Sequence, residues 1–459
     1  MAATITNDFK RVILRKIFDD ISNDVNSYYI GIGKGSAWND ADEFPTPTGS
    51  IKEVRDARAA MQSIKSAANV SFAITRRNWS SGSFYDSWDD NLVGEGTNPF
   101  YVITEENSVY ICLRESRAVD GTRNQSTVKP TGSDPLKPIT TSDGYKWKYL
   151  YTLLPADATN FLSANFMPVR KSSGAESGLG AQQDAVQAAS VRGQVLGVKL
   201  YDGGAGYSSV PTVTIEGDGS GATATAFVTS GAITHIFIDS DTDSGLASGR
   251  NYNFAGVNIS GGAPSRAGRA RAVIGDIFGE GVGADPRNDL KSTSLMFQTK
   301  PDGAEGGAFF VDGQDFRQVT LIKDPIDSNG TELTGTAINS SKFITADDGT
   351  EAGGFALDAV LTGQTSGSKA IFLGNSSTKI FINQNDSTGF GLFQAEDIQG
   401  TADGGGTNTA TLIDGGTIRY ENNYTPGDSD KGQLMYIDNR AAVIRDAAQA
   451  EDLKVVIQI

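Results

Sequence analysis

The sequence predicts a mainly β protein with helices near its start and inserted small β modules built from Gly-rich repeats. From about residue 70 onward, short alternating apolar runs are separated by Gly, Asn, Asp and Pro, which is the pattern of strands joined by turns. The clearest run is DGYKWKYLY, where Tyr145, Trp147 and Tyr149 share one strand face after an Asp-Gly turn. Aromatic side chains on one face indicate a core or an interface more often than a ligand platform.

Two helices are expected before these strands. Apolar residues recur at helical spacing within residues 9–21, with Asn7 as the expected cap, so this amphipathic helix must dock on another surface. A second helix is predicted from Ser50, which forms a capping box with Glu53, to about Ala68.

Changes in composition divide the chain. Apolar density is high at first, falls in a Ser-, Gly-, Ala- and Gln-rich stretch with a short helix expected around 184–189, and recovers in 315–325 and 432–459. We expect the recovered segments to complete the sheets of the first unit. The predicted division is a mostly β core unit with two helices at 1–170, a linker at 171–190, an inserted Gly-rich β repeat module at 191–275, core continuation at 276–332, a second inserted β module at 333–430, and C-terminal strands completing the core at 431–459.

An internal repeat supports the first insertion. Residues 206–228 are echoed by residues 251–274, and each copy reads as a strand, a Gly turn and a strand with small residues at alternate positions. Small residues let a second backbone pack closely, which indicates a compact β module.

Charge and cysteine content limit the partners. A net charge of -16 argues against nucleic acid and anionic membrane, because such binding needs clustered Lys and Arg. The one cysteine, Cys112, is expected to be buried and inert, and it permits neither an intrachain disulfide nor a multi-thiolate metal site. Near the N-terminus, charged residues interrupt the apolar positions, whereas a secretory signal needs an uninterrupted apolar region. No apolar run is long enough to span a bilayer. The chain is therefore expected to be made and assembled in a cytoplasm.

Two motifs resemble ligand sites but have the wrong spacing. GIGKG at 31–35 is not a phosphate loop, because Tyr28 and Gly35 stand where a glycine and a Ser or Thr are needed, so a strand-end turn is expected. DSDTDSG at 239–245 lacks the glycine and terminal Glu of an EF-hand, which favours a solvated acidic turn. No cofactor or metal site is predicted, although ion binding at 239–243 stays open.

Catalytic residues are not predicted either. The single histidine, His235, excludes triads and zinc-hydrolase sites with several histidines, and no nucleophile stands beside it. Asp86, Asp89 and Asp90 lie in the aromatic-rich run NWSSGSFYDSWDD and could serve a glycosidase, but nothing in their spacing sets the required carboxylate separation. Sugar binding is an alternative for this run, and an interface or structural role is favoured.

Paired arginines beside Trp79 suit bidentate or stacked contacts with a carboxylate on a partner chain. For Arg317 and Arg440 an internal ion pair is an equal alternative. The candidate interface residues are Trp38, Arg76, Arg77, Trp79, Tyr85, Trp88, Trp147, Arg317 and Arg440.

Four blocks carry a family resemblance. In order, they are GIGKGSAWND with EFPTPTGS, ITRRNW, DGYKWKYLYTLLPAD, and DFRQVTLIKDP with the closing LMYIDNR and EDLKVVIQI. Together they resemble the baseplate wedge subunit encoded by gene eight of T-even-type contractile-tailed bacteriophages. The likeness covers about 25–170, 315–325 and 432–459; Ala441 and Ala442 stand where prolines are expected, and the Gly-rich repeats enlarge the middle.

The resemblance implies a homodimeric structural virion protein with no catalytic residues, built into the tail baseplate. Its fold would be mainly β: a layered β-sandwich core with helices in its loops, plus the inserted small β modules. It would join neighbouring wedge proteins and take part in the baseplate switch that triggers sheath contraction. Two alternatives stay open. A receptor or glycan-binding tail protein would use the run at 78–90 and the inserted modules, and a cell-wall hydrolase would use the acidic cluster.

Overall fold

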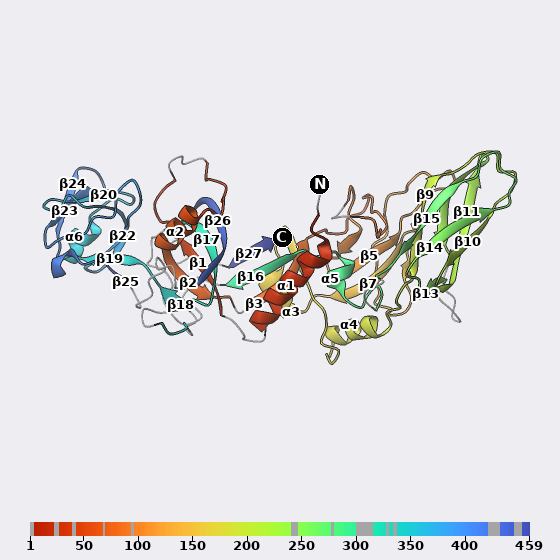
Figure 1. Ribbon diagram of the computed structural model, residues 1–459, viewed down its shortest axis with the longest axis horizontal. Helices are drawn as coiled ribbons and strands as arrows, with labels where there is room; N and C mark the ends of the chain where they lie inside the picture. The colour runs from red at the N-terminus through yellow and green to blue at the C-terminus, as the bar shows by residue number, and fades with distance from the viewer. Residues whose placement is uncertain are drawn as a thin grey trace. The chain divides into compact units, whose positions relative to one another are not determined.

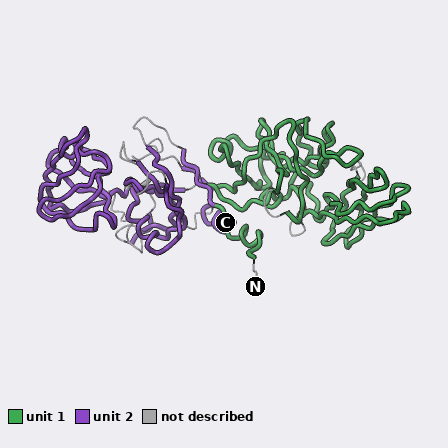
Figure 2. Tube along the Cα trace, turned by 90° about the horizontal axis from the view of Figure 1, so that it is seen from above, with its two compact units in different colours: residues 1–14, 71–296, 458–459 green, residues 15–70, 297–457 purple. Residues whose placement is uncertain are grey.

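A computed structural model of the chain confirms the mainly β fold (Figure 1). By packing, the chain falls into two compact units: 1–14, 71–296 and 458–459 form the first, and 15–70 and 297–457 the second (Figure 2). The structure describes residues 4–22, 27–38, 43–67, 69–92, 96–239, 247–276, 280–299, 315–326, 330–333, 337–420, 432–444 and 452–459, and within them the strands form five sheets.

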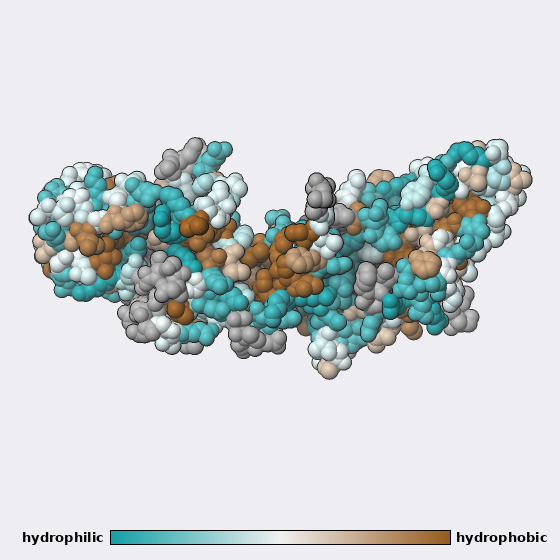
Figure 3. All heavy atoms as spheres, viewed as in Figure 1, coloured by the Kyte–Doolittle hydropathy of each residue, from teal (hydrophilic) through white to brown (hydrophobic). Residues whose placement is uncertain are grey.

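The first helix, α1, spans Asn7–Ser22. Its cap is Thr6 rather than the expected Asn7, because the Thr6 Oγ1 accepts a hydrogen bond from the Phe9 N–H at 3.3 Å. Leu14 is fully buried, whereas Phe9 and Val12 are 55% and 60% exposed. Figure 3 shows hydrophobic side chains gathered over α1, so part of the amphipathic face is left open.

The second helix, α2, spans Ile51–Ala59 and opens with the predicted capping box. Ser50 Oγ accepts from the Glu53 N–H at 3.2 Å, and Glu53 Oε2 accepts from the Gly49 N–H at 2.7 Å. The first bond satisfies an amide donor of the first helical turn, and the second ties the residue before the cap to that turn.

The prediction that this helix continues to about Ala68 is wrong. Strand β2 (Met61–Ser66) follows at once and lies between β1 (Tyr28–Gly33) and β18 (Ala337–Asn339). Pairing on both edges satisfies the backbone of β2 and outweighs its helix-like apolar spacing.

The first unit contains a sheet of order β4-β5-β7-β6 together with three helices. A further four-stranded sheet has the order β27-β16-β3-β8. The strands are β3 (Asn69–Thr75), β4 (Tyr101–Ile103), β5 (Ser108–Arg114), β6 (Ile139–Thr140), β7 (Lys146–Thr152), β8 (Phe166–Val169), β16 (Ser294–Thr299) and β27 (Leu453–Gln458), and the helices are α3 (Pro155–Phe161), α4 (Leu179–Ala188) and α5 (Pro286–Asp289).

Helix α4 occupies much of 171–190, where the sequence predicts a linker and a short helix around 184–189. Its Val186 is fully buried and belongs to the hydrophobic cluster of Trp147 and Tyr149 on β7. Gln183 is also buried, and its Nε2 donates to the Arg170 carbonyl at 2.9 Å. The segment is therefore packed onto the unit through half of its length.

Residues 195–274 form a sheet of their own, within the module predicted at 191–275. Its strand order is β12-β11-β10-β14-β15-β9, with β13 paired to β11. The strands are β9 (Val195–Asp202), β10 (Thr212–Gly217), β11 (Ser220–Thr229), β12 (Ala232–Ile238), β13 (Ser248–Arg250), β14 (Ala255–Ser260) and β15 (Arg269–Ile274). The two copies of the repeat are the β10–β11 and β14–β15 hairpins, which pair with each other through β10 and β14.

This sheet curls toward closure. Its outermost strands meet where the Ile233 N–H donates to the Gly203 carbonyl at 2.8 Å. A Cβ at Gly203 would lie 2.3 Å from the Ile233 carbonyl oxygen, so the approach requires glycine. The strands that are first and last along the chain, β9 and β15, also pair, with Val195 opposite Ile274.

The second unit contains a sheet of order β18-β2-β1-β17-β26. Strand β17 (Phe316–Lys323) pairs with β1 on one edge and with β26 (Gln433–Val443) on the other. Segments that are hundreds of residues apart in the sequence are thus neighbours in one sheet.

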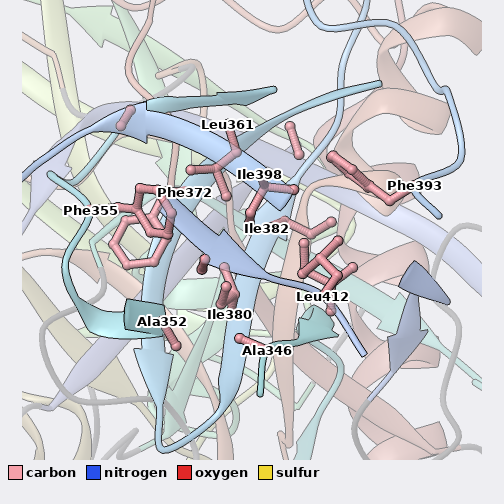
Figure 4. Packing of buried hydrophobic residues seen from close by; sticks show 14 residues of the cluster. Ala346, Ala352, Phe355, Leu361, Phe372, Ile380, Ile382, Phe393, Ile398 and Leu412 are labelled. Carbon is pink, nitrogen blue, oxygen red and sulfur yellow. The ribbon is translucent and has the colours of Figure 1, made fainter. Parts of the chain in front are cut away.

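A further sheet of this unit is made by residues 342–420, within the module predicted at 333–430, in the order β24-β23-β20-β21-β22-β19-β25. Phe355 and Phe372 face each other in its core, with ring centroids 5.6 Å apart (Figure 4). Lys342 is opposite Tyr420, so this module also enters and leaves through paired strands. The elements are β19 (Lys342–Thr345), α6 (Gly349–Gly353), β20 (Val360–Gly363), β21 (Lys369–Ser376), β22 (Lys379–Asn383), β23 (Asp397–Thr401), β24 (Thr407–Thr411) and β25 (Arg419–Tyr420).

We expect Leu361→Ala to destabilise the second module by about 2–5 kcal/mol, because Leu361 is fully buried in its core and the truncation leaves a cavity. Hydrogen exchange of peptides from 342–420 measures the change directly. Leu392→Ala is the matched control, since Leu392 is 75% exposed. Equal loss of protection in both variants would contradict the assigned core.

Candidate functional site

The aromatic face of DGYKWKYLY forms a buried cluster. Trp147 stacks on Tyr145 at a centroid distance of 5.8 Å and meets the edge of Tyr85 at 5.3 Å. Tyr149 and the sulfur of Cys112 belong to the same cluster. Burial raises the pKa of the Cys112 thiol, which keeps it in the neutral form.

Several candidate interface residues therefore lie in the interior. Tyr85 and Trp147 are almost completely buried, and Trp88 donates from Nε1 to the Asp289 carbonyl at 2.9 Å. Arg317 is buried too, and it pairs with Asp315 at 3.3 Å, which matches the internal alternative. Because their own chain encloses them, these four side chains offer no surface to a partner in this conformation.

The remaining candidates keep exposed surface. Trp38 is half-buried and donates from Nε1 to the Arg440 carbonyl at 2.9 Å, and Arg440 pairs with Asp438 at 2.8 Å. Trp79 donates from Nε1 to Ser126 Oγ at 3.2 Å. The two other exposed or half-buried candidates are Arg76 and Arg77.

The acidic run near these aromatics is neutralised by arginines. Asp86 pairs with Arg123 at 2.6 Å, while Arg271 of β15 pairs with both Asp89 and Asp90. Burial raises the pKa of Asp89, but a hydrogen bond from the Asn91 N–H and the ion pair with Arg271 outweigh it and hold that pKa below its usual value. Asp89 and Asp90 join the 78–90 run to the first module through Arg271, and Asp89 is not held protonated as a glycosidase acid would be.

The structure describes one of the two rejected motifs in full. A Cβ at Gly33 of GIGKG would lie 2.5 Å from the Ala60 carbonyl oxygen, so this glycine serves close packing at a strand end. In DSDTDSG, Asp239 accepts a hydrogen bond from Thr225 Oγ1 at 2.7 Å, and residues 240–245 lie outside the described part of the chain.

Sequence reasoning missed a pocket in the first unit, about 240 Å³ in volume. The β5 and β7 strands line one side, and β9 and β12 of the first module line the other. Five cationic side chains and one carboxylate, Glu115, contribute to its wall. The cations are Arg114, Arg117, Lys146, Lys148 and Lys199.

This charge balance is the reverse of the whole chain, which has 55 acidic against 39 basic residues. Glu115 is already engaged, because Arg117 pairs with it and the Arg123 Nε lies 3.1 Å away. The wall therefore has more cationic than acidic side chains, in a chain whose overall balance is the opposite.

His235 and Phe237 line the module side of this pocket, and their rings are packed closely with other aromatic groups. His235 stacks on Phe227 at a centroid distance of 4.4 Å and lies 4.5 Å from Phe237. The Arg114 guanidinium sits 4.8 Å above the Phe237 ring, a cation–π geometry. Burial, followed by the positive charges of Arg117 and Arg114, lowers the pKa of His235 below 6.5.

A second pocket, of about 790 Å³, lies beside α2 in the second unit. Its aromatic side chains include Trp38, Phe44 and Phe390, of which Phe44 and Phe390 are 47% and 59% exposed. Amide side chains, among them Asn385, and carboxylates complete the wall. Apolar rings next to polar groups are typical of ligand sites and of interfaces.

Within the described residues, no helix is both long and apolar enough to cross a membrane, and no cluster of three or more His, Cys, Asp or Glu could hold a metal ion. Neither a protein-family profile nor a curated protein sequence matches this chain.

We expect the unfolding midpoint of the wild type, relative to a His235→Gln variant, to fall as pH decreases from 7.5 to 5.5. The unfolded chain keeps a histidine pKa near 6.5, whereas the folded pKa is lower, so the unfolded state binds the proton first and acidification favours unfolding. Thermal denaturation of both proteins at each pH measures the difference between their unfolding midpoints. Carboxylates titrate in both proteins, so their effect cancels in this difference. A constant difference would contradict the lowered pKa.

Arg271→Met should destabilise the first unit by about 1–3 kcal/mol, because it leaves Asp89 and Asp90 side by side without their shared cation. Chemical denaturation followed by tryptophan fluorescence measures this loss of stability, because Trp88 directly precedes the two carboxylates in the sequence. Arg266→Met is the control, because Arg266 pairs with Asp202 and its side chain is 58% exposed. We expect it to change the free energy of unfolding by no more than about 0.5 kcal/mol. Equal effects of the two substitutions would show that Arg271 is an ordinary surface residue.

Proposed function

We propose that this chain is a structural subunit of the baseplate wedge in a contractile phage tail. It forms a homodimer, joins neighbouring wedge proteins, and takes part in the switch that precedes sheath contraction. It is assembled in the host cytoplasm and resides in the virion. The observation that carries the proposal is the ordered set of four sequence blocks that resemble the gene-eight product family.

The positions of these blocks in the fold support the proposal. GIGKG contains the end of β1, DFRQVTLIKDP contains β17 and LMYIDNR lies in β26. These three strands are neighbours in one sheet. DGYKWKYLY and EDLKVVIQI supply β7 and β27. The resembling segments thus make the sheets, while the Gly-rich modules form sheets of their own, as expected for a common framework with insertions.

Exposed apolar surface also fits an assembly part. Phe9 and Val12 lie about one turn apart at the start of α1, and Ile5 directly precedes the helix cap. All three side chains are 55% to 63% exposed; we call them the α1 stripe. An exposed row of large apolar side chains is typical of surfaces that another protein covers. A switch would act by repacking such interfaces between two arrangements.

Sedimentation of the purified protein, alone and with the neighbouring wedge proteins, tests the proposal. We expect a dimer that co-assembles, and we expect Phe9→Glu with Val12→Glu to weaken association at least tenfold, because a charge would have to be buried. Ile51→Glu is the matched control, since Ile51 is 90% exposed outside the stripe. A strictly monomeric protein that does not assemble would refute the proposal.

A receptor or glycan-binding tail protein is the second candidate. The second pocket favours it, because exposed Phe44 and Phe390 could stack on sugar rings beside amide and carboxylate groups. The run at 78–90 gives less support, since its Asp86, Asp89 and Asp90 are engaged by arginines. Glycan arrays and host-cell binding separate the candidates, because a wedge part binds neither.

A further inference from the structure

We infer that the pocket between β5–β7 and β9–β12 binds a small oxyanion, a sulfate or carboxylate group, through Arg114 and Lys199. The inference concerns a ligand site and is independent of the proposed structural role.

The cation balance of the wall is the first support. Five cationic side chains face a single carboxylate, and Glu115 is held by Arg117 and Arg123. Like charges gathered around one small space repel each other, and an anion between them removes that repulsion.

The donors of Arg114 are the second support. Its Nε is buried and has no hydrogen-bond partner among the described residues, and its Nη2 reaches only the Gly144 carbonyl, at 3.4 Å. A guanidinium carries five N–H donors arranged to grip two oxygens at once. Because Phe237 covers one face of the guanidinium, its donor edge is the part left for a ligand.

Lys199 comes from the opposite side of the pocket and supplies a point charge. Its Nζ donates to Ser87 Oγ at 2.9 Å, which uses one of its three donors and orients the ammonium group. Ser87 also lines the pocket and can present its hydroxyl to the same anion. A volume of about 240 Å³ is smaller than typical drug-sized sites, so the bound group is small.

His235 reports occupancy because it is the only histidine of the chain. The charged groups that lower its pKa are Arg114 and Arg117, from β5 and the segment that follows it, while Thr234 and Phe227 contact the ring from the module. A bound anion offsets those positive charges, together with that of Lys199, so the pKa of His235 rises on binding.

The test uses tag-free protein carrying ¹³C-labelled histidine. Sodium sulfate is titrated against sodium chloride at equal ionic strength while the imidazole resonance is followed. We expect a saturable shift with sulfate, absent with chloride, and an upward change in the titration midpoint of His235. No saturable response to sulfate, succinate or an acidic peptide would overturn the inference.

Variants locate the site. Arg114→Gln and Lys199→Gln should each weaken sulfate binding at least tenfold, while Arg114→Lys keeps the charge but loses the two-oxygen grip and should fall between. Arg269→Gln is the control, because Arg269 is exposed on the same module outside the pocket. If sulfate binds the wild type, Arg114→Gln, Lys199→Gln and the control variant equally tightly, the inferred site is wrong.

The ligand arms distinguish the source of the group. Sulfate and succinate represent free ions, and the peptide Gly-Asp-Gly, compared with Gly-Asn-Gly, represents a carboxylate carried by another protein. Binding of the free ions alone supports a small-ion site, and aspartate-dependent binding of the peptide supports a site for an acidic side chain. A variant that fails to fold leaves the wild-type titration to decide the question.

Discussion

The two-residue alternation of β7 is the constraint on which the first unit depends. Trp147 and Tyr149 point into the aromatic cluster with Tyr85, so Lys146 and Lys148 must lie on the opposite face. That face lines the basic pocket, where the first module supplies the other wall. The core and the candidate site are thus two sides of one strand, and neither can shift register without disturbing the other.

The entrance to β7 is fixed by a single carboxylate. Asp143 accepts hydrogen bonds from the Thr127 and Val128 N–H groups at 2.7 and 2.9 Å. Burial raises the pKa of Asp143, but these hydrogen bonds and one from Thr141 outweigh it and lower that pKa, so the carboxylate stays ionised at neutral pH. Gly144 follows at a positive φ of 93°, where a Cβ would meet the Ser116 hydroxyl at 2.7 Å. The Asp-Gly pair in the sequence therefore forms a specific turn at the start of β7.

Local patterns were enough to predict the β class, the aromatic face and the capping box at Ser50, because each depends on neighbours in the sequence. They could not predict where α2 ends, because β2 is decided by strands that arrive from distant parts of the chain. Nor could they separate interface from core among the aromatics: Trp88 and Trp147 have the same composition signal as exposed rings. The basic pocket could not be predicted from the sequence for the same reason. Its residues Arg114, Lys199 and His235 belong to three different strands, and no spacing rule connects them.

The paired first and last strands of both Gly-rich modules have a consequence for the history of the chain. Val195 opposite Ile274, and Lys342 opposite Tyr420, put the points of entry and exit side by side. A stretch with adjacent ends can be gained, lost or exchanged in a single recombination event while the host loop barely changes its span. Lineages of such a protein can thus differ greatly in length while their shared framework stays the same size.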